Sequence, residues 1–297
     1  MIFRKTINIK LLIIGGGRWA KIYLKEILQN FDLDEIYFIT NNKEIQEKSN
    51  TTKIHILKKN SKIKINNFKK IIICNKTSQH LKYTKNANKQ NSFLIEKPLT
   101  NNPIDYYNKK ILSKAYIALQ FSFAEYFVKL KEKLQKKKIK SIQLNWLDSP
   151  FADKKYNDKI YFIEDTYYHF YSIIRIFLGK KLNLLNSNSE ISVTKIKTVV
   201  KNTEIILNVS DKHHKKAREL IIKVQNDKYT VYFSNIKKII IKKNRNVFKE
   251  IFIGTKTLDK QILYFLTSSK KLNINSLNNQ EALFEDLTLL RNKVGKK

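Results

Sequence analysis

The chain has 297 residues, of which 42% are hydrophobic, so it is long enough for two ordinary domains and apolar enough to bury a core. Its single cysteine, Cys74, excludes an internal disulfide and a cysteine-based zinc site. No apolar stretch of the sequence approaches the roughly 20 residues that a membrane span needs. We expect a cytoplasmic protein with no metal site and no membrane partner.

The formal net charge of +34 raises the question of a nucleic-acid partner. Only six of the 59 basic residues are arginine, the side chain whose planar fork reads bases, and the other 53 are lysine. The lysines are spread along the whole chain beside many asparagines and isoleucines, and all three residue types have A/T-rich codons. A coding bias explains the charge, and we expect no nucleic-acid partner.

Short apolar strands alternate with helical patterns over residues 1–118. Each expected strand is a short apolar run bounded by polar residues, at 9–14, 36–39, 54–57, 71–74 and 93–95. A helix follows the first strand, with apolar residues at helical spacing from Trp19 to Leu28, and another is expected over 78–90. This alternation predicts βαβ units and a parallel sheet, as in a dinucleotide-binding Rossmann domain.

The pattern changes in the second part of the chain. Helices are expected at 124–138, at 165–178 before Gly179, at 258–268 and at 280–292. Strands are expected at 142–146 and in longer stretches at 203–209, 219–233 and 247–253, with a hairpin turn at Asn226-Asp227. We therefore expect an α/β Rossmann domain followed by an α+β domain at 119–297, with an open, mostly antiparallel sheet for substrate binding or oligomerisation.

The sequence GGGRWA at residues 15–20 lies between the first strand and its helix and matches G-x-G-x-x-[GA]. In this context Gly15 allows a tight turn, and Gly17 lets the backbone approach a pyrophosphate at the helix N-terminus. Ala20 allows the helix to pack closely on the strand. A turn without a ligand is the alternative. We expect the cofactor to contact Gly15, Gly17, Arg18 and Trp19.

The loop Thr40-Asn41-Asn42-Lys43 follows the second strand, where dinucleotide enzymes contact the adenine ribose. An acid at this place binds the 2′-hydroxyl and repels a 2′-phosphate, and this loop has none. Thr40 and Asn41 can donate hydrogen bonds to a phosphate, and Lys43 is a nearby cation. The loop favours NADP(H) over NAD(H), unless it is an ordinary polar loop.

Glu96-Lys97-Pro98 follows the fifth strand, and parallel sheets bind ligands at the carboxyl ends of their strands. Lys97 beside Glu96 would be an ammonium able to donate to a substrate oxygen. Pro98 would fix the turn, as a trans or a cis peptide.

Asp165 and His169 lie four residues apart and so share one face of a helix. Histidine is the natural acid or base near neutral pH, and a carboxylate can orient its ring. A solvent-exposed pair is the alternative interpretation.

Together these landmarks resemble the Gfo/Idh/MocA oxidoreductases, which use NAD(H) or NADP(H) on sugars, cyclitols and related compounds. Three elements fall in the family's order: the glycine turn at 15–20, Glu96-Lys97-Pro98, and Asp165-x-x-x-His169 followed by Arg175 and Gly179. Thr77 and His80 match the family's turn after its fourth strand. The resemblance covers nearly the whole chain, and Glu-Lys-Pro is its most specific element.

The resemblance implies roles for individual residues. Lys97 would polarise the reacting oxygen, and His169 would be the general acid or base, supported by Asp165. Cofactor contacts would come from Glu96, Thr77 and His80. The implied function is hydride transfer to or from a sugar or sugar-like substrate, for example a nucleotide-activated sugar of surface-glycan synthesis. A homodimer or homotetramer is implied as well.

Departures from the family's pattern concern the substrate side. Phe162-Ile163-Glu164 stands where the family often has a glycine-rich stretch, and Tyr167 replaces a glycine. Ser172 replaces an acid, and Phe123 replaces an arginine. Two alternatives therefore stay open: a reductase of a C=N or C=C bond in a non-sugar metabolite, and a non-catalytic dinucleotide-binding regulator.

Overall fold

The computed structural model describes residues 4–48, 53–57, 64–85, 87–88, 90–101, 115–135, 137–149, 160–179, 183–235, 238–244, 248–253, 257–268 and 277–295. The chain divides into two compact units, Met1–Ala118 with Leu258–Leu277, and Leu119–Thr257 with Asn278–Lys297. The sequence-based division at 118 assigned Leu258–Leu277 to the second domain. These residues group with the first unit because Ile262 and Phe265 belong to its apolar core.

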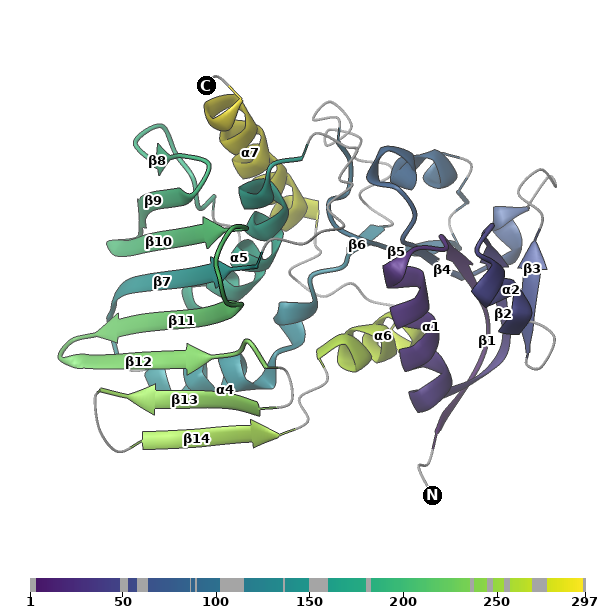
Figure 1. Cartoon of the computed structure of the whole chain (residues 1–297), viewed down its shortest axis with the longest axis horizontal. Helices are drawn as coiled ribbons and strands as arrows, with labels where there is room; N and C mark the ends of the chain where they lie inside the picture. Colours follow the sequence, from purple (N-terminus) through teal and green to yellow (C-terminus); the bar gives the residue numbers. More distant parts are fainter. Residues whose placement is uncertain are drawn as a thin grey trace. The chain divides into compact units, whose positions relative to one another are not determined.

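The first unit contains a parallel six-stranded sheet in the order β3-β2-β1-β4-β5-β6 (Figure 1). Its strands are β1 (Lys5–Ile14), β2 (Phe31–Ile39), β3 (Ile54–Leu57), β4 (Lys70–Ile73), β5 (Ser92–Ile95) and β6 (Ala115–Ile117). β1, β4 and β5 end in continuous buried apolar runs, as in a sheet covered on both faces. The chain leaves β1 in one direction for β2 and returns to β4 on the other side, so the carboxyl ends of β1 and β4 flank the place where such sheets bind ligands.

Helices complete this unit: α1 (Arg18–Asn30), α2 (Lys43–Lys48), α6 (Thr257–Thr267) and the 3-10 helices η1 (Ile65–Asn67) and η2 (Thr77–Thr84). α1 and α6 share one apolar core with the sheet. The helix expected over 78–90 is shorter than predicted, because the described residues form the 3-10 helix η2, which ends at Thr84. The segment buries Leu81 but offers no continuous apolar stripe, and the Thr84 hydroxyl donates to the Leu81 carbonyl oxygen at 2.8 Å.

The second unit contains an eight-stranded sheet in the order β14-β13-β12-β11-β7-β10-β9-β8. Its strands are β7 (Ile139–Leu147), β8 (Glu190–Ile191), β9 (Lys195–Val200), β10 (Thr203–Ser210), β11 (Ala217–Val224), β12 (Asp227–Tyr232), β13 (Lys238–Lys243) and β14 (Phe248–Ile253). Neighbouring strands are antiparallel, except that β7 and β10 are parallel. The predicted fold class, a Rossmann domain followed by an α+β domain with a mostly antiparallel sheet, is confirmed.

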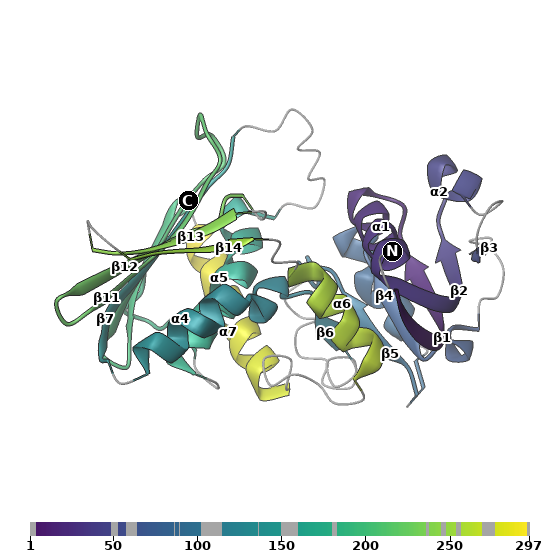
Figure 2. The ribbon, with the colours of Figure 1, turned by 90° about the horizontal axis from the view of Figure 1, so that it is seen from below.

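One face of this second sheet packs against helices (Figure 2). They are η4 (Gln120–Phe123), α4 (Glu125–Leu134), α5 (Phe162–Leu178) and α7 (Leu277–Val294). Residues of β7, β10 and β11 alternate between buried and half-exposed, because only one face is covered. α5 ends as expected at Gly179, whose φ of 92° is available to glycine. The hairpin turn lies at Gln225-Asn226, one residue earlier than predicted, since Val224 pairs with Asp227.

Among the described residues, none of the helices combines the length and the apolar character that crossing a bilayer requires. In the same residues, no three His, Cys, Asp or Glu side chains are grouped so that they could hold a metal ion.

Candidate functional site

The glycine turn after β1 is tight at its first two positions and open at the third. Gly15 has a φ of 143°, and a Cβ there would lie 2.8 Å from the Cys74 carbonyl carbon and oxygen. A Cβ on Gly16 would clash with the Thr40 hydroxyl oxygen. A Cβ on Gly17 would meet no described atom within 4 Å. The first two glycines are therefore required by the fold, whereas the third leaves space beside the start of α1.

The N-terminus of α1 is suited to an anion. Gly17 is the N-cap residue and provides no side-chain hydrogen bond, and the first turn of α1 contains no acid. The amides of this turn consequently have no side-chain acceptor within α1, and the helix dipole adds partial positive charge. Ala20 is fully buried, as close packing on the sheet requires, while Arg18 is exposed and Trp19 is half-buried. A pyrophosphate fits this backbone arrangement.

A cavity of about 330 Å³ adjoins the glycine turn and is lined by the carboxyl ends of β1, β2 and β4, through Ile14, Gly15, Gly16, Ile39, Thr40, Asn41, Asn42, Asn75, Gln79 and Tyr83. The Thr40 hydroxyl oxygen accepts from the Asn42 amide at 3.0 Å, and the Asn42 side chain accepts from the Ile45 amide at 3.2 Å. The first of these bonds fixes the loop, and the second caps α2. Thr40 and Asn41 thus lie where the sequence predicts a ribose-contacting loop.

Three lining residues, Asn75, Gln79 and Tyr83, were missed by the sequence analysis. The carboxyl-end rule that selected the other strands also applies to β4, which Asn75 follows closely, so this residue was within reach of that rule. The Asn75 side-chain oxygen is buried and has no hydrogen-bond partner among the described residues. Such an acceptor next to a cavity is suited to a ligand hydroxyl or amine.

His80 is buried between two turns of the first unit. Its ring is 2% exposed, with Nδ1 2.9 Å from the Pro98 carbonyl oxygen and Nε2 3.0 Å from the Asn75 carbonyl oxygen. The ring therefore bridges the turns after β4 and β5. Within the described residues, neither His80 nor Thr77 lines the cavity. The contacts of His80 support a role in holding the Lys97 turn.

Glu96, Lys97 and Pro98 follow β5 as predicted, and the Lys97–Pro98 peptide is cis. Glu96 is 5% exposed, and its Oε1 accepts from the Tyr23 hydroxyl at 2.5 Å. Its Oε2 accepts from the Lys97 amide at 3.2 Å. Lys97 itself is half-buried. Tyr23 was not identified from the sequence, because a tyrosine on the apolar face of a helix has the pattern of a core residue.

In the second unit, His169 lies on α5 among aromatic rings. It is 7% exposed, so the solvent-exposed interpretation does not describe its ring. The imidazole stacks on Trp146, with ring centres 4.9 Å apart and planes 16° apart, and meets Phe121 edge-on at 5.1 Å. Asp165, one turn earlier, is half-buried. The stacked and the edge-on contact together restrict how the imidazole can rotate, as a proton-transferring ring requires.

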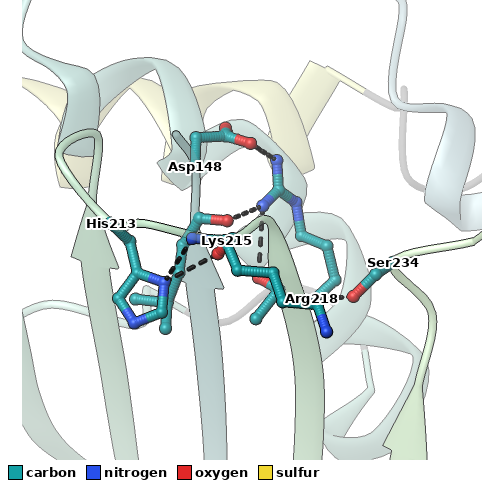
Figure 3. A network of polar contacts seen from close by, with 7 residues as sticks. Asp148, His213, Lys215, Arg218 and Ser234 are labelled. Carbon is teal, nitrogen blue, oxygen red and sulfur yellow. Dashed lines mark hydrogen bonds and ion pairs between the residues drawn. The ribbon is translucent and has the colours of Figure 1, made fainter. Parts of the chain in front are cut away.

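Trp146 also connects His169 to a buried ion pair on the same sheet face. The Arg218 guanidinium carbon lies 3.9 Å from the Trp146 ring centre. Arg218 donates to both carboxylate oxygens of Asp148, at 2.6 and 2.7 Å, and to the Leu147 carbonyl oxygen at 2.7 Å (Figure 3). Burial lowers the pKa of Arg218, while the Asp148 carboxylate opposes that shift. The guanidinium of this pair lies over the Trp146 ring and so helps to hold the tryptophan that stacks on His169. None of these residues except His169 was singled out from the sequence.

Two departures from the family's pattern have structural partners. Glu164, which is 1% exposed, forms an ion pair with Arg291 of α7. The Tyr167 hydroxyl donates to Asp286 of α7 at 2.8 Å. Both side chains therefore tie α5 to α7, where a glycine could not. Lys97 and Glu96 belong to the first unit, and Asp165 and His169 belong to the second.

No protein-family model and no curated protein matches the sequence. Solved structures do match the fold. UDP-N-acetylglucosamine 3-dehydrogenase GnnA from Acidithiobacillus ferrooxidans has a TM-score of 0.77 at 16% identity, covering 98% of this chain and 99% of its own. KijD10, a 3-ketoreductase from Actinomadura kijaniata in complex with NADP and TDP-benzene, has a TM-score of 0.76 at 11% identity, covering 95% and 97%.

A Gfo/Idh/MocA family oxidoreductase from Vibrio cholerae has a TM-score of 0.67 at 12% identity and covers 97% of this chain and 100% of its own. At such identities the similarity concerns the fold. The chain has the two-domain fold of the Gfo/Idh/MocA oxidoreductases, as the resemblance in its sequence predicts.

Proposed function

We propose that this chain is an NAD(P)-dependent oxidoreductase of the Gfo/Idh/MocA type that transfers a hydride to or from a sugar or sugar-like substrate. One observation carries the proposal: the glycine turn and the acid-free N-terminus of α1 adjoin a cavity at the carboxyl ends of β1, β2 and β4. That arrangement provides amides for a pyrophosphate and space for the attached nucleoside.

A sugar is the favoured substrate class because one protein of the same fold is named for a nucleotide sugar and another is bound to a TDP compound. GnnA is a UDP-N-acetylglucosamine 3-dehydrogenase, and KijD10 is a 3-ketoreductase bound to NADP and TDP-benzene. A nucleotide-activated sugar, such as a precursor of a surface glycan, is therefore the first substrate to test. The net charge of +34 also favours an anionic substrate through long-range attraction.

The chain's own residues would provide binding, orientation and proton transfer. When bound, the nicotinamide supplies the hydride chemistry. Lys97 would donate a hydrogen bond to the reacting oxygen and stabilise negative charge there. His169 would be the general acid or base, with Asp165 supporting the ring. Thr40, Asn41 and Lys43 would favour NADP(H) over NAD(H), since none of them repels a 2′-phosphate.

Thermal unfolding with and without NADPH or NADH tests the proposal, because a ligand that binds only the folded state raises the melting temperature. We expect a rise for the wild type and none for Gly17→Val, whose side chain would fill the space beside the α1 amides. The melting temperature without ligand should stay near the wild-type value, since a Cβ at this position meets no described atom. Lys25→Val, on the exposed side of α1, is the matched control and should keep the response.

No rise with either dinucleotide would reject the proposal. If the rise occurs, a screen of nucleotide sugars against imines and enones, followed by cofactor absorbance, separates a sugar enzyme from a reductase of C=N or C=C bonds. Binding without turnover of any of these substrates would favour the regulator.

A further inference from the structure

The Tyr23–Glu96 contact joins two parts of the first unit that the proposed function uses separately. Tyr23 lies on α1, whose N-terminus follows the glycine turn. Glu96 immediately precedes Lys97. The hydroxyl-to-carboxylate distance is 2.5 Å, and the two side chains are 0% and 5% exposed. A hydrogen bond between a hydroxyl and a carboxylate at this distance is among the strong ones.

The protonation of the neighbouring groups fixes the direction of this bond. Burial and the nearby Glu96 raise the pKa of Tyr23 well above its usual value, so the phenol keeps its proton and donates it. Burial and Glu96 likewise raise the pKa of the Cys74 thiol. Near neutral pH both neighbours are thus uncharged, and the Tyr23 hydroxyl serves Glu96 as a donor.

The second carboxylate oxygen of Glu96 accepts from the Lys97 backbone amide at 3.2 Å. A carboxylate that is held at one oxygen has a defined rotamer, so its other oxygen is held in place as well. Two hydrogen bonds in series thus lead from Tyr23 to the backbone of Lys97. On the far side of the turn, the Pro98 carbonyl oxygen is in contact with His80.

We propose that Tyr23 is a positioning residue, whose hydroxyl orients Glu96 and through it the Lys97 backbone. The catalytic role of Lys97 rests on the proposed function, whereas the positioning of its backbone by Tyr23 and Glu96 does not. It also joins the helix that would bind the pyrophosphate to the residue that would bind the substrate oxygen.

Amide hydrogen exchange of the protein without added ligand tests this inference. In Tyr23→Phe we expect exchange at the Lys97 amide to become about tenfold faster, the factor given by the loss of one net hydrogen bond. Tyr167→Phe is the matched control, because it also removes a fully buried hydroxyl that donates to a carboxylate, that of Asp286 in the second unit. Tyr167→Phe should leave the exchange rate of the Lys97 amide unchanged.

Unchanged exchange at Lys97 in Tyr23→Phe would overturn the inference, as would equal acceleration in both variants, which would indicate general loosening. A chain that binds no dinucleotide would reject the proposed function while leaving this measurement valid. The two failures are therefore distinguishable.

Turnover provides a second readout. Tyr23→Phe should lower kcat about tenfold and change the Kd for NADPH by less than about threefold, because the α1 amides are unaltered. In a Glu96→Ala background, the same substitution should have no further effect on kcat, since its intermediary is gone. Additive losses in the double variant would show that Tyr23 does not act through Glu96.

Discussion

The candidate site of the first unit is built largely from backbone, whereas that of the second unit is built from side chains. The cavity beside the glycine turn depends on Gly15 and Gly16, on helix amides and on the ends of strands. His169 instead depends on the rings of Trp146 and Phe121. The chain contains 53 lysines. Replacement of exposed residues by lysine, asparagine or isoleucine leaves the backbone amides unchanged, so a site built from backbone keeps its chemistry.

This difference shows which substitutions matter in each unit. In the first, substitutions that alter the turn, fill the cavity or change the charge beside it should affect binding. In the second, the loss of a single ring or ion pair changes the environment of His169, because Trp146 contacts both His169 and Arg218. The departures from the family's pattern accordingly occur in the second unit, while the glycine turn of the first unit matches the motif throughout.

The largest expected effects are on turnover. Lys97→Met and His169→Ala should each reduce kcat by about 10²- to 10⁴-fold, the usual contribution of a positioned acid or base. The Kd for NADPH should change little, because neither side chain lines the cavity that we assign to the cofactor. Steady-state kinetics and NADPH fluorescence measure the two quantities separately.

Lys76→Met and His214→Ala are the matched controls, since both residues are exposed. They should retain turnover within about twofold, as surface substitutions usually do. Near-normal turnover in the Lys97 variant would remove this lysine from the mechanism, and the same result for His169 would leave its aromatic surroundings with a purely structural role.

A second expected effect concerns the buried carboxyl of Asp286 in the side-chain-built unit. Burial raises its pKa from 3.8 to about 7, although it accepts from the Leu184 and Leu185 amides and from Tyr167. Between these two pH values the folded chain keeps a proton that the unfolded chain has released. The contribution of this group to the free energy of unfolding should therefore fall as the pH rises from about 4 to 7, by up to about 4 kcal/mol.

Denaturant unfolding at several pH values measures this slope. Above pH 7 the contribution should be constant, and in Asp286→Asn the whole step should disappear. If the free energy of unfolding of the wild type instead rises with pH relative to that of Asp286→Asn, the three hydrogen bonds keep the carboxylate ionised. The second unit would then lack the pH-dependent loss of stability that we expect of it.

The fold was predictable because its strands are apolar runs and because glycine marks the turn after β1 and the end of α5. All five expected strands of the parallel sheet occur, but β6 was missed there, and β8, β9 and β13 were missed in the second sheet. β6 is only three residues long, and β13 is a lysine-rich and isoleucine-rich run without a clear boundary. The helix expected over 78–90 forms only as the 3-10 helix η2, which ends at Thr84, because the segment has no continuous apolar stripe.

The residues of the site could be predicted only where a sequence motif or a fixed spacing identifies them. Gly15, Lys97 and His169 follow from motifs and spacing, and their roles remain predictions. Tyr23 and Arg218 could not be recognised, because their significance comes from partners 73 and 70 residues away. A buried tyrosine and a strand arginine have no local pattern that marks such a partner.

The smallest expected effect concerns cofactor choice and the backbone-built site itself. Thr40 is 8% exposed, lines the cavity, and accepts from the Asn42 amide through its hydroxyl oxygen. An aspartate at this position can accept the same amide, because aspartate forms this turn readily, so Thr40→Asp should preserve the loop. It adds one negative charge where a 2′-phosphate would lie.

A charge-assisted contact contributes roughly 1.5–3 kcal/mol, so Thr40→Asp should weaken NADPH binding about ten- to a hundredfold and leave NADH binding equal or tighter. Thr40→Ser keeps the hydroxyl without the charge and should retain the wild-type preference for NADPH. The measurement is the ratio of the two dissociation constants in the three proteins. Tighter binding of NADH by the wild type, or an unchanged Kd for NADPH in Thr40→Asp, would show that this loop does not contact the 2′-phosphate. Because Lys43 is exposed in the first turn of α2, its substitution by glutamine should shift the same ratio less than Thr40→Asp does.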